Sequence, residues 1–482
     1  MINFIYLIII HTHFLLGAEK NLEDVLNRII NLASQRFSVD YAEARIQRIS
    51  KTYITLKERR IETAKEGFES GVAIRVLLNG AWGFASTCIL TMENLKNALT
   101  EACRMAIAAS RQIKTPVEIA ETKAIKDKVS VKPQKNPAQI PIEEKIRDLS
   151  SIAKTILNYD SRICGCTIDY LDIVGTNYFM NSRGTYIEQD MLYVWSRVTA
   201  TAGEASILTF SREEIGSTAG YEIFDINHPE NIGKKTAERA INQLKAKSPR
   251  GGRYPVVLGP NVVGVFVHEA FGHLAEADLT LSGSVLMDKL GEKIASENVT
   301  IYDDGTIYGA FGSFKYDDEG VPSQRTLLVK GGVVVNLMHN LETAKKFNVE
   351  PTGNARAESF KYAPIIRMRN TFLEPRDYSF EELLEDVKFG YYLKSFRGGQ
   401  ANLDGTFQVG IQEAYEIIHG EIGALVRDVS ISGNTLETLF KVDAVGKDFE
   451  LSPGRCGKGQ TAFVSDGGPH IRVREVIVGG SA

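Results

Sequence analysis

The chain has 482 residues, of which 43% are hydrophobic and 24% are charged, with 56 basic and 60 acidic side chains. This length predicts two or three domains that each bury a core, and the composition is typical of a globular protein. The net charge of −4 argues against a nucleic-acid-binding protein. Five cysteines in so long a chain indicate reduced thiols and a cytoplasmic location, not a disulfide framework.

The first 21 residues differ in composition from the rest of the chain. An apolar run at residues 4–10 is interrupted by His11, Thr12 and His13 and is too short to span a bilayer. A secretory signal would require basic residues before this run, and none is present. We therefore expect a disordered leader or an over-extended start at 1–21, with a signal, an anchor or an ordered appendage as alternatives, and no membrane partner.

A small α+β domain is predicted over residues 22–112. Apolar residues at helical spacing are followed by strand-like alternation, a turn signal at Asn79-Gly80 and a second helical pattern. The predicted elements are a helix at 22–36, strands at 41–47 and 52–56, a hairpin centred on Asn79 and Gly80, and a helix at 92–112. The next segment, 113–141, is rich in lysine, glutamate and proline and is predicted to be a linker.

Two further units follow the predicted linker. A central α+β region at 142–248 is predicted to hold strands at 162–171, 176–181, 185–189 and 191–202. Helices at 143–157 and 230–247 flank them, and Pro229 opens the second helix. The C-terminal domain, 249–482, is predicted to begin with a strand at 254–258 and to turn at Gly259-Pro260. A helix capped by Asn261 is expected next.

The rest of the C-terminal domain reads mostly as strands. Hairpin tips are expected at Gly331-Gly332 and at His419-Gly420, the latter between two strands that together extend over 407–432. The fold class predicted for the whole chain is α+β and multi-domain. Small N-terminal α/β units precede a strand-rich C-terminal domain, which carries a bulged helix.

That bulged helix contains the chemically most informative residues. His268, Glu269 and His273 resemble the H-E-x-x-H motif of zinc peptidases, but the histidines lie five positions apart instead of four. On a regular helix this spacing would place the two side chains ~140° apart, so they could not face one ion. A π-type bulge, a bend or a helix end before His273 would reconcile them, and Gly272 would tolerate such a backbone. The alternative is a buried core helix that contains these residues by chance.

A third ligand cannot be chosen from spacing alone. Three groups of residues are candidates: nearby carboxylates, distant imidazoles and one distant thiol. They are Glu276, Asp278 and Glu292; His339, His419 and His470; and Cys456. Cys456 differs from the other cysteines because it lies between glycines on a predicted loop, where Arg455 and Lys458 would favour the thiolate.

Several segments together resemble the TldD branch of the TldD/PmbA metallopeptidase family. They are HEAFGH at 268–273, PGRCGKGQ at 453–460, and the segments at 317–329, 352–356, 364–371 and 396–417. The resemblance extends over about 22–480. It implies a zinc ion (Zn²⁺) held by His268, His273 and Cys456, with water in the fourth position and Glu269 as general base and later proton donor. It also implies a dimer with a paralogue that lacks the motif, or with a second copy of the chain.

The function implied by this resemblance is zinc-dependent hydrolysis of short or unfolded peptides. Two other classes remain open: a zinc hydrolase acting on a non-peptide amide, and a non-catalytic subunit that holds structural zinc. Glu269 argues against the last, since a purely structural site needs no base. Glycine-rich segments at 397–400 and 457–460 could bind an extended peptide by strand addition or form ordinary turns, so the substrate-binding residues are not identified.

Overall fold

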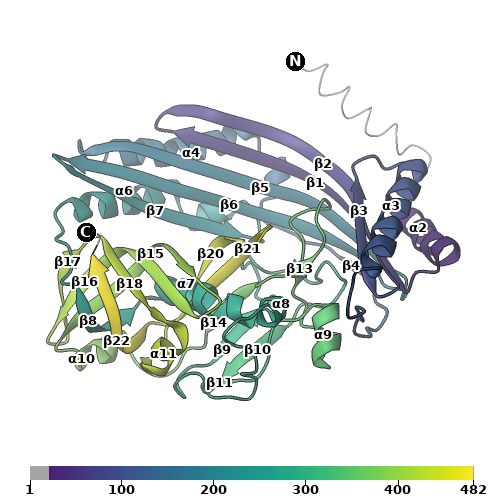
Figure 1. Ribbon diagram of the computed structural model, residues 1–482. Helices are drawn as coiled ribbons and strands as arrows, with labels where there is room; N and C mark the ends of the chain where they lie inside the picture. Colours follow the sequence, from purple (N-terminus) through teal and green to yellow (C-terminus); the bar gives the residue numbers. More distant parts are fainter. Residues whose placement is uncertain (1–20, 481–482) are drawn as a thin grey trace.

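The computed structural model describes residues 21–480. The predicted leader lies outside these residues except for Asn21, which caps the first helix. A long, curved sheet arches over the C-terminal half of the chain, and helices lie on its outer face (Figure 1). No helix within residues 21–480 has the length and apolar character needed to cross a bilayer.

One seven-stranded sheet forms the upper part of the molecule. Its order is β3-β2-β1-β5-β6-β4, and β7 pairs with β6. The strands are β1 (Tyr41–Lys57), β2 (Arg60–Leu78), β3 (Ala81–Thr87), β4 (Lys126–Val129), β5 (Ile163–Asn181), β6 (Tyr186–Glu204) and β7 (Ile207–Ser217). The sheet spans the boundary predicted between residues 22–112 and 142–248, so this division stays a prediction. Strand β4 lies inside the segment predicted as a linker.

The predicted turn at Asn79 and Gly80 joins β2 to β3. Both residues have positive φ, 53° and 71°, as a two-residue type I′ hairpin requires. The strands themselves are longer than the sequence pattern predicted. The stretches at 41–47 and 52–56 belong to one strand, β1, because the residues between them also pair with β2 and β5.

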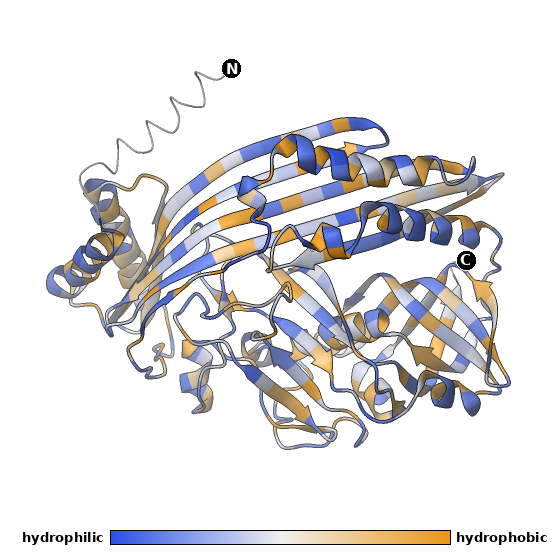
Figure 2. Cartoon of the chain, turned by 180° about the vertical axis from the view of Figure 1, so that it is seen from behind, coloured by the Kyte–Doolittle hydropathy of each residue, from blue (hydrophilic) through white to orange (hydrophobic). Residues whose placement is uncertain are grey.

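Four long helices cover one face of this sheet, as Figure 2 shows from behind for two of them, α4 and α6. They are α2 (Leu22–Phe37), α3 (Met92–Ser110), α4 (Ile142–Leu157) and α6 (Pro229–Leu244), with the short α5 (Ile223–Ile226) and 3₁₀ turn η1 (Pro137–Gln139) nearby. Strand alternation explains the two-sided burial. Ala44 and Ile54 of β1 pack under these helices, whereas Ile49 packs against Phe311 of the C-terminal half.

The C-terminal half contains two larger sheets and one small one. The first, in the order β15-β8-β22-β18-β16-β17 with β19 on β22, consists of β8 (Gly252–Leu258), β15 (Phe389–Ala401), β16 (Thr406–Ile418), β17 (Glu421–Val426), β18 (Val429–Asn434), β19 (Val442–Val445) and β22 (Ile471–Gly480). The second, β11-β10-β9-β14-β21-β20, consists of β9 (Ile301–Asp304), β10 (Arg325–Lys330), β11 (Val333–Val334), β14 (Asn370–Leu373), β20 (Glu450–Gly457) and β21 (Thr461–Gly468). The small sheet pairs β12 (Ala355–Arg356) with β13 (Ile365–Ile366).

Short helices connect these strands, and both predicted hairpin tips are present. The helices are α7 (Pro260–Val265), the π-helix η2 (Phe266–Gly272), the 3₁₀ turn η3 (His273–Ala275), α8 (Ala277–Leu281), α9 (Leu341–Phe347), α10 (Phe380–Glu385) and α11 (Thr435–Phe440). Gly331-Gly332 and His419-Gly420 all have positive φ. Around the second tip the structure has a third strand, β18, that the sequence pattern had merged with β17. The strand-rich C-terminal half confirms the predicted fold class.

Buried ion pairs join the two halves. Arg75 of β2 contacts both Glu43 of β1 and Glu319 of the C-terminal half, and Arg45 contacts Asp318 at 2.8 Å. All three carboxylates are at least four-fifths shielded from solvent. Because removing one partner would leave a buried charge without compensation, these pairs fix the large sheet firmly over the C-terminal half.

Candidate metal centre

The helix that carries the two histidines starts directly after strand β8. Gly259 is its N-cap and Pro260 occupies the first helical position, where a proline is well tolerated. The prediction that Asn261 caps the helix is therefore wrong. The Asn261 side chain instead accepts a hydrogen bond from the Phe396 backbone at 2.7 Å and contacts Ser452, so it ties the helix start to β15 and β20.

The helix changes to π geometry over Phe266–Gly272, as the five-residue spacing of the histidines predicted. The backbone N–H of His273 bonds the carbonyl of His268, which is the i→i+5 bond of a π turn. This wider turn brings both histidines to one side of the helix. Their ring centroids are 5.3 Å apart.

Gly272 has a different role from the one predicted. Its φ and ψ of −58° and −47° are ordinary helical values, so no special backbone conformation requires a glycine here. A Cβ atom at this position would lie 2.1 Å from the Met368 sulfur, and Met368 is fully buried. The glycine therefore allows close packing of the π turn against the segment that leads into β14.

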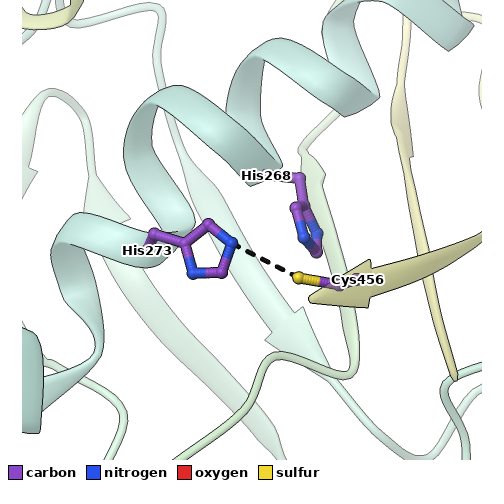
Figure 3. A group of neighbouring side chains, drawn as sticks. All are labelled: His268, His273 and Cys456. Atoms are coloured by element: carbon purple, nitrogen blue, oxygen red, sulfur yellow. Dashed lines mark hydrogen bonds between the residues drawn. The ribbon is translucent and has the colours of Figure 1, made fainter. Parts of the chain in front are cut away.

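Cys456 completes the group from a distant part of the chain (Figure 3). It lies on β20, the edge strand of its sheet, and its Sγ is 3.3 Å from Nε2 of His273. The candidate ligand atoms of His268, His273 and Cys456 all lie within 4.8 Å of one another. The structure thus brings together the three side chains that the sequence resemblance singled out.

The three side chains strongly perturb one another's protonation. Burial alone would raise the pKa of the Cys456 thiol, but the two neighbouring imidazoles lower it to about 4. Burial acts to lower the pKa of both histidines. Contact with Cys456 raises the pKa of His268 to about 9, and contacts with Cys456 and Glu276 raise the pKa of His273 to about 10. The Cys456 thiolate and the protonated forms of the two histidines therefore stabilise one another.

The chemistry of this group fits a divalent metal ion such as zinc. Two imidazoles and one thiolate are the nitrogen and sulfur donors that zinc accepts. Nδ1 of the buried His268 has no hydrogen-bond partner within residues 21–480, and a buried polar atom of this kind calls for a partner such as an ion or a water molecule. Glu269 is about one-third exposed and its carboxylate lies 3.9 Å from Nε2 of His273, beside the three donors and not among them.

Glu276, one of the alternative third ligands, contacts a histidine instead. Its fully buried carboxylate lies 2.8 Å from Nδ1 of His273, so Nε2 of that ring is directed towards Cys456. Lys458 contacts Glu276 at 3.2 Å and Asp278 at 2.7 Å. Lys458 was predicted to stabilise the Cys456 thiolate, but it pairs with these carboxylates. His268 and His273 stabilise the thiolate instead.

The remaining candidate ligands are not part of the donor group, although His470 lines the cavity next to it. Glu292 pairs with Lys289 on the surface, and His339 is buried against Phe347. His419 occupies the β16–β17 turn. His470 lies 2.7 Å from Asp448 and 3.0 Å from the hydroxyl of Tyr392.

The group opens onto a cavity of about 740 Å³, whose lining includes His268, Glu269 and Cys456. Strand β7 of the large sheet, together with β15 and β20, forms much of its wall. Asp466 is a buried carboxyl in this wall, and burial raises its pKa to about 7. It lies in a plain strand pattern with no motif, so only the folded structure reveals it.

A second cavity, of about 520 Å³, shares Arg455 with the first and contains none of the three donors.

Comparison with known proteins places the chain in a family. Three consecutive segments match the PmbA/TldA metallopeptidase: domain 1 at 42–106, the central domain at 135–244 and the C-terminal domain at 251–480. A metalloprotease of Methanothermobacter thermautotrophicus is 43% identical over 446 residues, which are 92% of this chain and 96% of that protein. The zinc metalloprotease TldD homolog of Saccharolobus solfataricus is 35% identical over 93% of this chain and 98% of its own length.

Solved structures share the fold. A Thermotoga maritima protein described as a candidate modulator of a DNA gyrase superposes with a TM-score of 0.78 and 25% identity, over 95% of this chain and all of that one. TldE from Thermococcus kodakarensis superposes with a TM-score of 0.75 over the same shares, and its 20% identity supports the fold alone. The resemblance predicted from the sequence is therefore confirmed, and the chain is a metallopeptidase of the PmbA/TldD family.

Proposed function

We propose that this metallopeptidase depends on zinc and hydrolyses short or unfolded peptides. His268, His273 and Cys456 would hold the ion, and Glu269 would act as general base. The observation that carries the proposal is the convergence of the three donor atoms within 4.8 Å at the wall of a cavity that Glu269 also lines. The name of the Saccharolobus solfataricus relative, a zinc metalloprotease, supports the choice of metal.

The residues of the chain have separate tasks in this proposal. When bound, zinc would supply Lewis acidity that acidifies a water molecule and polarises the peptide carbonyl. The Glu269 carboxylate accepts the proton of the attacking water and passes it to the leaving amine. Glu276 holds His273 in orientation through Nδ1, in the manner of carboxylates behind metal-bound histidines.

The cavity favours small or extended substrates. Its volume of about 740 Å³ is within the ~300–1,000 Å³ of ordinary ligand pockets, which accommodates a few peptide residues but no folded protein. The large sheet forms one wall of this cavity, so a substrate has to enter between the two halves of the chain.

The proposal extends to assembly and location. We expect a dimer with a paralogue that lacks the motif or with a second copy of the chain, and the shared fold with TldE is consistent with the first. The five cysteines are all free, which agrees with a reducing cytoplasm.

Metal removal tests the function directly. Protein that has been treated with a chelator and dialysed should no longer cleave an unstructured fluorogenic peptide. Addition of one equivalent of Zn²⁺ should restore cleavage. Elemental analysis measures the zinc content, and fluorescence measures the cleavage. A non-peptide amide hydrolase would bind zinc yet leave a peptide library intact. A structural zinc subunit would keep zinc and cleave nothing.

Replacing Glu276 by Gln should weaken zinc binding by ~10-fold, within the range found for groups that orient a metal-bound histidine. The variant keeps the size of the side chain but loses the charge that faces Nδ1 of His273. Competition for zinc with a chromophoric chelator measures the effect. Asp278→Asn is the matched control, because Asp278 contacts Lys458 but neither histidine. Equal affinities in both variants would contradict the orienting role.

A further inference from the structure

Arg212 of β7 lies in the cavity wall and has no role in the function proposed above. Along β7, Ser211 and Glu213 face α6, where both contact Arg239. Alternation along the strand therefore turns Arg212 to the opposite face, towards the C-terminal half. Arg212 lines the same cavity as Glu269 and Cys456.

Most other cations of this cavity are already neutralised. Five of them form ion pairs with glutamate or aspartate: Arg197 with Glu214, Lys235 with Glu213, Arg239 with Glu213 and Glu413, Lys394 with Glu413, and Arg397 with Asp428. Within residues 21–480, Arg212 and Arg455 form no such pair. The two glutamates nearest Arg212 along the chain, Glu213 and Glu214, are taken by other cations.

The Arg212 side chain is partly buried and lines the cavity. Its Nε is buried without any hydrogen-bond partner within the described residues. Burial, together with the charges of Arg197 and Arg397, lowers its pKa. Arg455 lies over the Trp195 ring, 5.2 Å from its centroid, and so retains its charge and its hydrogen-bond donors. A buried N–H without an acceptor is unfavourable, and an incoming anion would supply an acceptor for the Nε–H of Arg212.

We infer that Arg212, assisted by Arg455, binds a carboxylate of the peptide substrate, so that the enzyme prefers peptides with an acidic group near the cleaved bond. The inference rests on the proposed peptidase function. A guanidinium presents paired N–H donors that match the two oxygens of a carboxylate. The carboxylate comes either from an aspartate or glutamate side chain or from the C-terminus of the peptide, and the test separates these two sources.

The test compares matched peptides on the zinc-loaded enzyme. Each fluorogenic peptide is made with Glu or Gln at one position beside the cleaved bond, and each with a free or an amidated C-terminus. We expect kcat/KM to favour one acidic form by ~10-fold, as for a charge-assisted hydrogen-bonded pair. A difference between the Glu and Gln peptides identifies a side-chain carboxylate, and a difference between the free and amidated peptides identifies the C-terminal carboxylate. In Arg212→Gln this ratio should fall to ~2-fold or less, whereas Arg212→Lys should retain part of it.

Controls keep the inference separate from the proposed function. Arg104→Gln removes an exposed arginine of α3 that pairs, among residues 21–480, with Glu101 alone, and it should preserve the ratio. If Arg212→Gln fails to fold, Arg455→Gln provides the second variant. Equal cleavage of acidic and neutral peptides by the wild type would overturn the inference and leave the peptidase intact.

Binding supplies a readout that does not depend on turnover. The zinc-loaded Glu269→Gln protein is titrated with labelled acidic and neutral peptides, and fluorescence anisotropy should show the same ~10-fold preference. Absence of cleavage in the wild type with this preference intact would contradict the proposed function but support the carboxylate site. If Arg212→Gln keeps the ratio but changes the mass measured by light scattering, the arginine contacts another subunit and the inference is wrong.

Discussion

Replacing Glu269 by Gln should lower kcat for peptide hydrolysis by ~10²–10⁴-fold, the usual contribution of a general base, while the protein keeps the zinc content of the wild type. The amide has nearly the same shape as the carboxylate but cannot accept a proton from water. Since Glu269 lies beside the three donors and is partly exposed to the cavity, its loss should not disturb metal binding. Steady-state cleavage of a fluorogenic peptide and elemental mass spectrometry give the two measurements.

Glu292→Gln is the matched control for this prediction. It makes the same chemical change at a surface glutamate that pairs with Lys289, and it should leave both kcat and zinc content unchanged. A Glu269→Gln enzyme with wild-type kcat would show that another group activates the water. Asp466, a buried carboxyl in the same cavity wall, would then be the next residue to replace.

Replacing Cys456 by Ser should weaken zinc binding by more than ~100-fold, since loss of a ligand exceeds the 10–100-fold cost of losing an orienting partner. A serine hydroxyl stays protonated at neutral pH and cannot replace a thiolate at zinc. Zinc content after dialysis should fall from about one ion per chain to a small fraction of that, and peptide cleavage should fall with it.

A control variant and a test of folding accompany the prediction for Cys456→Ser. Cys164→Ser removes an exposed thiol on β5 and should retain zinc and activity. Circular dichroism should show that Cys456→Ser remains folded, because the substitution lies on an edge strand and changes little volume. Wild-type zinc affinity in Cys456→Ser would exclude the cysteine as a ligand and would leave the two histidines with an unidentified third partner.

The sequence predicted the π turn because its constraint is local. A five-residue spacing between His268 and His273 admits few backbone solutions if both are to face one ion, and the structure adopts one of them. The role of Gly272 was predicted wrongly for the opposite reason. Its contact is with Met368, far along the chain, and spacing carries no information about such packing.

Charge partners were the hardest features to predict. Glu276 is close enough to His273 in sequence to suggest a ligand, but only the folded structure shows that it contacts the Nδ1 side of the ring. Arg212 lies in a strand, β7, that the sequence pattern did not predict at all. The long strands of the large sheet contain polar residues that interrupt the alternation, so they were predicted as shorter pieces.

The order of the three proposed ligands along the chain has a consequence for protein synthesis. Cys456 follows His273 by 183 positions, so both histidines leave the ribosome well before it does. At ~5–20 residues per second, the interval lasts ~10–40 s. A growing chain that ends before Cys456 carries the peptidase helix with only two of its three donors. The position of Cys456 thus delays assembly of the proposed zinc site until the growing chain has reached residue 456.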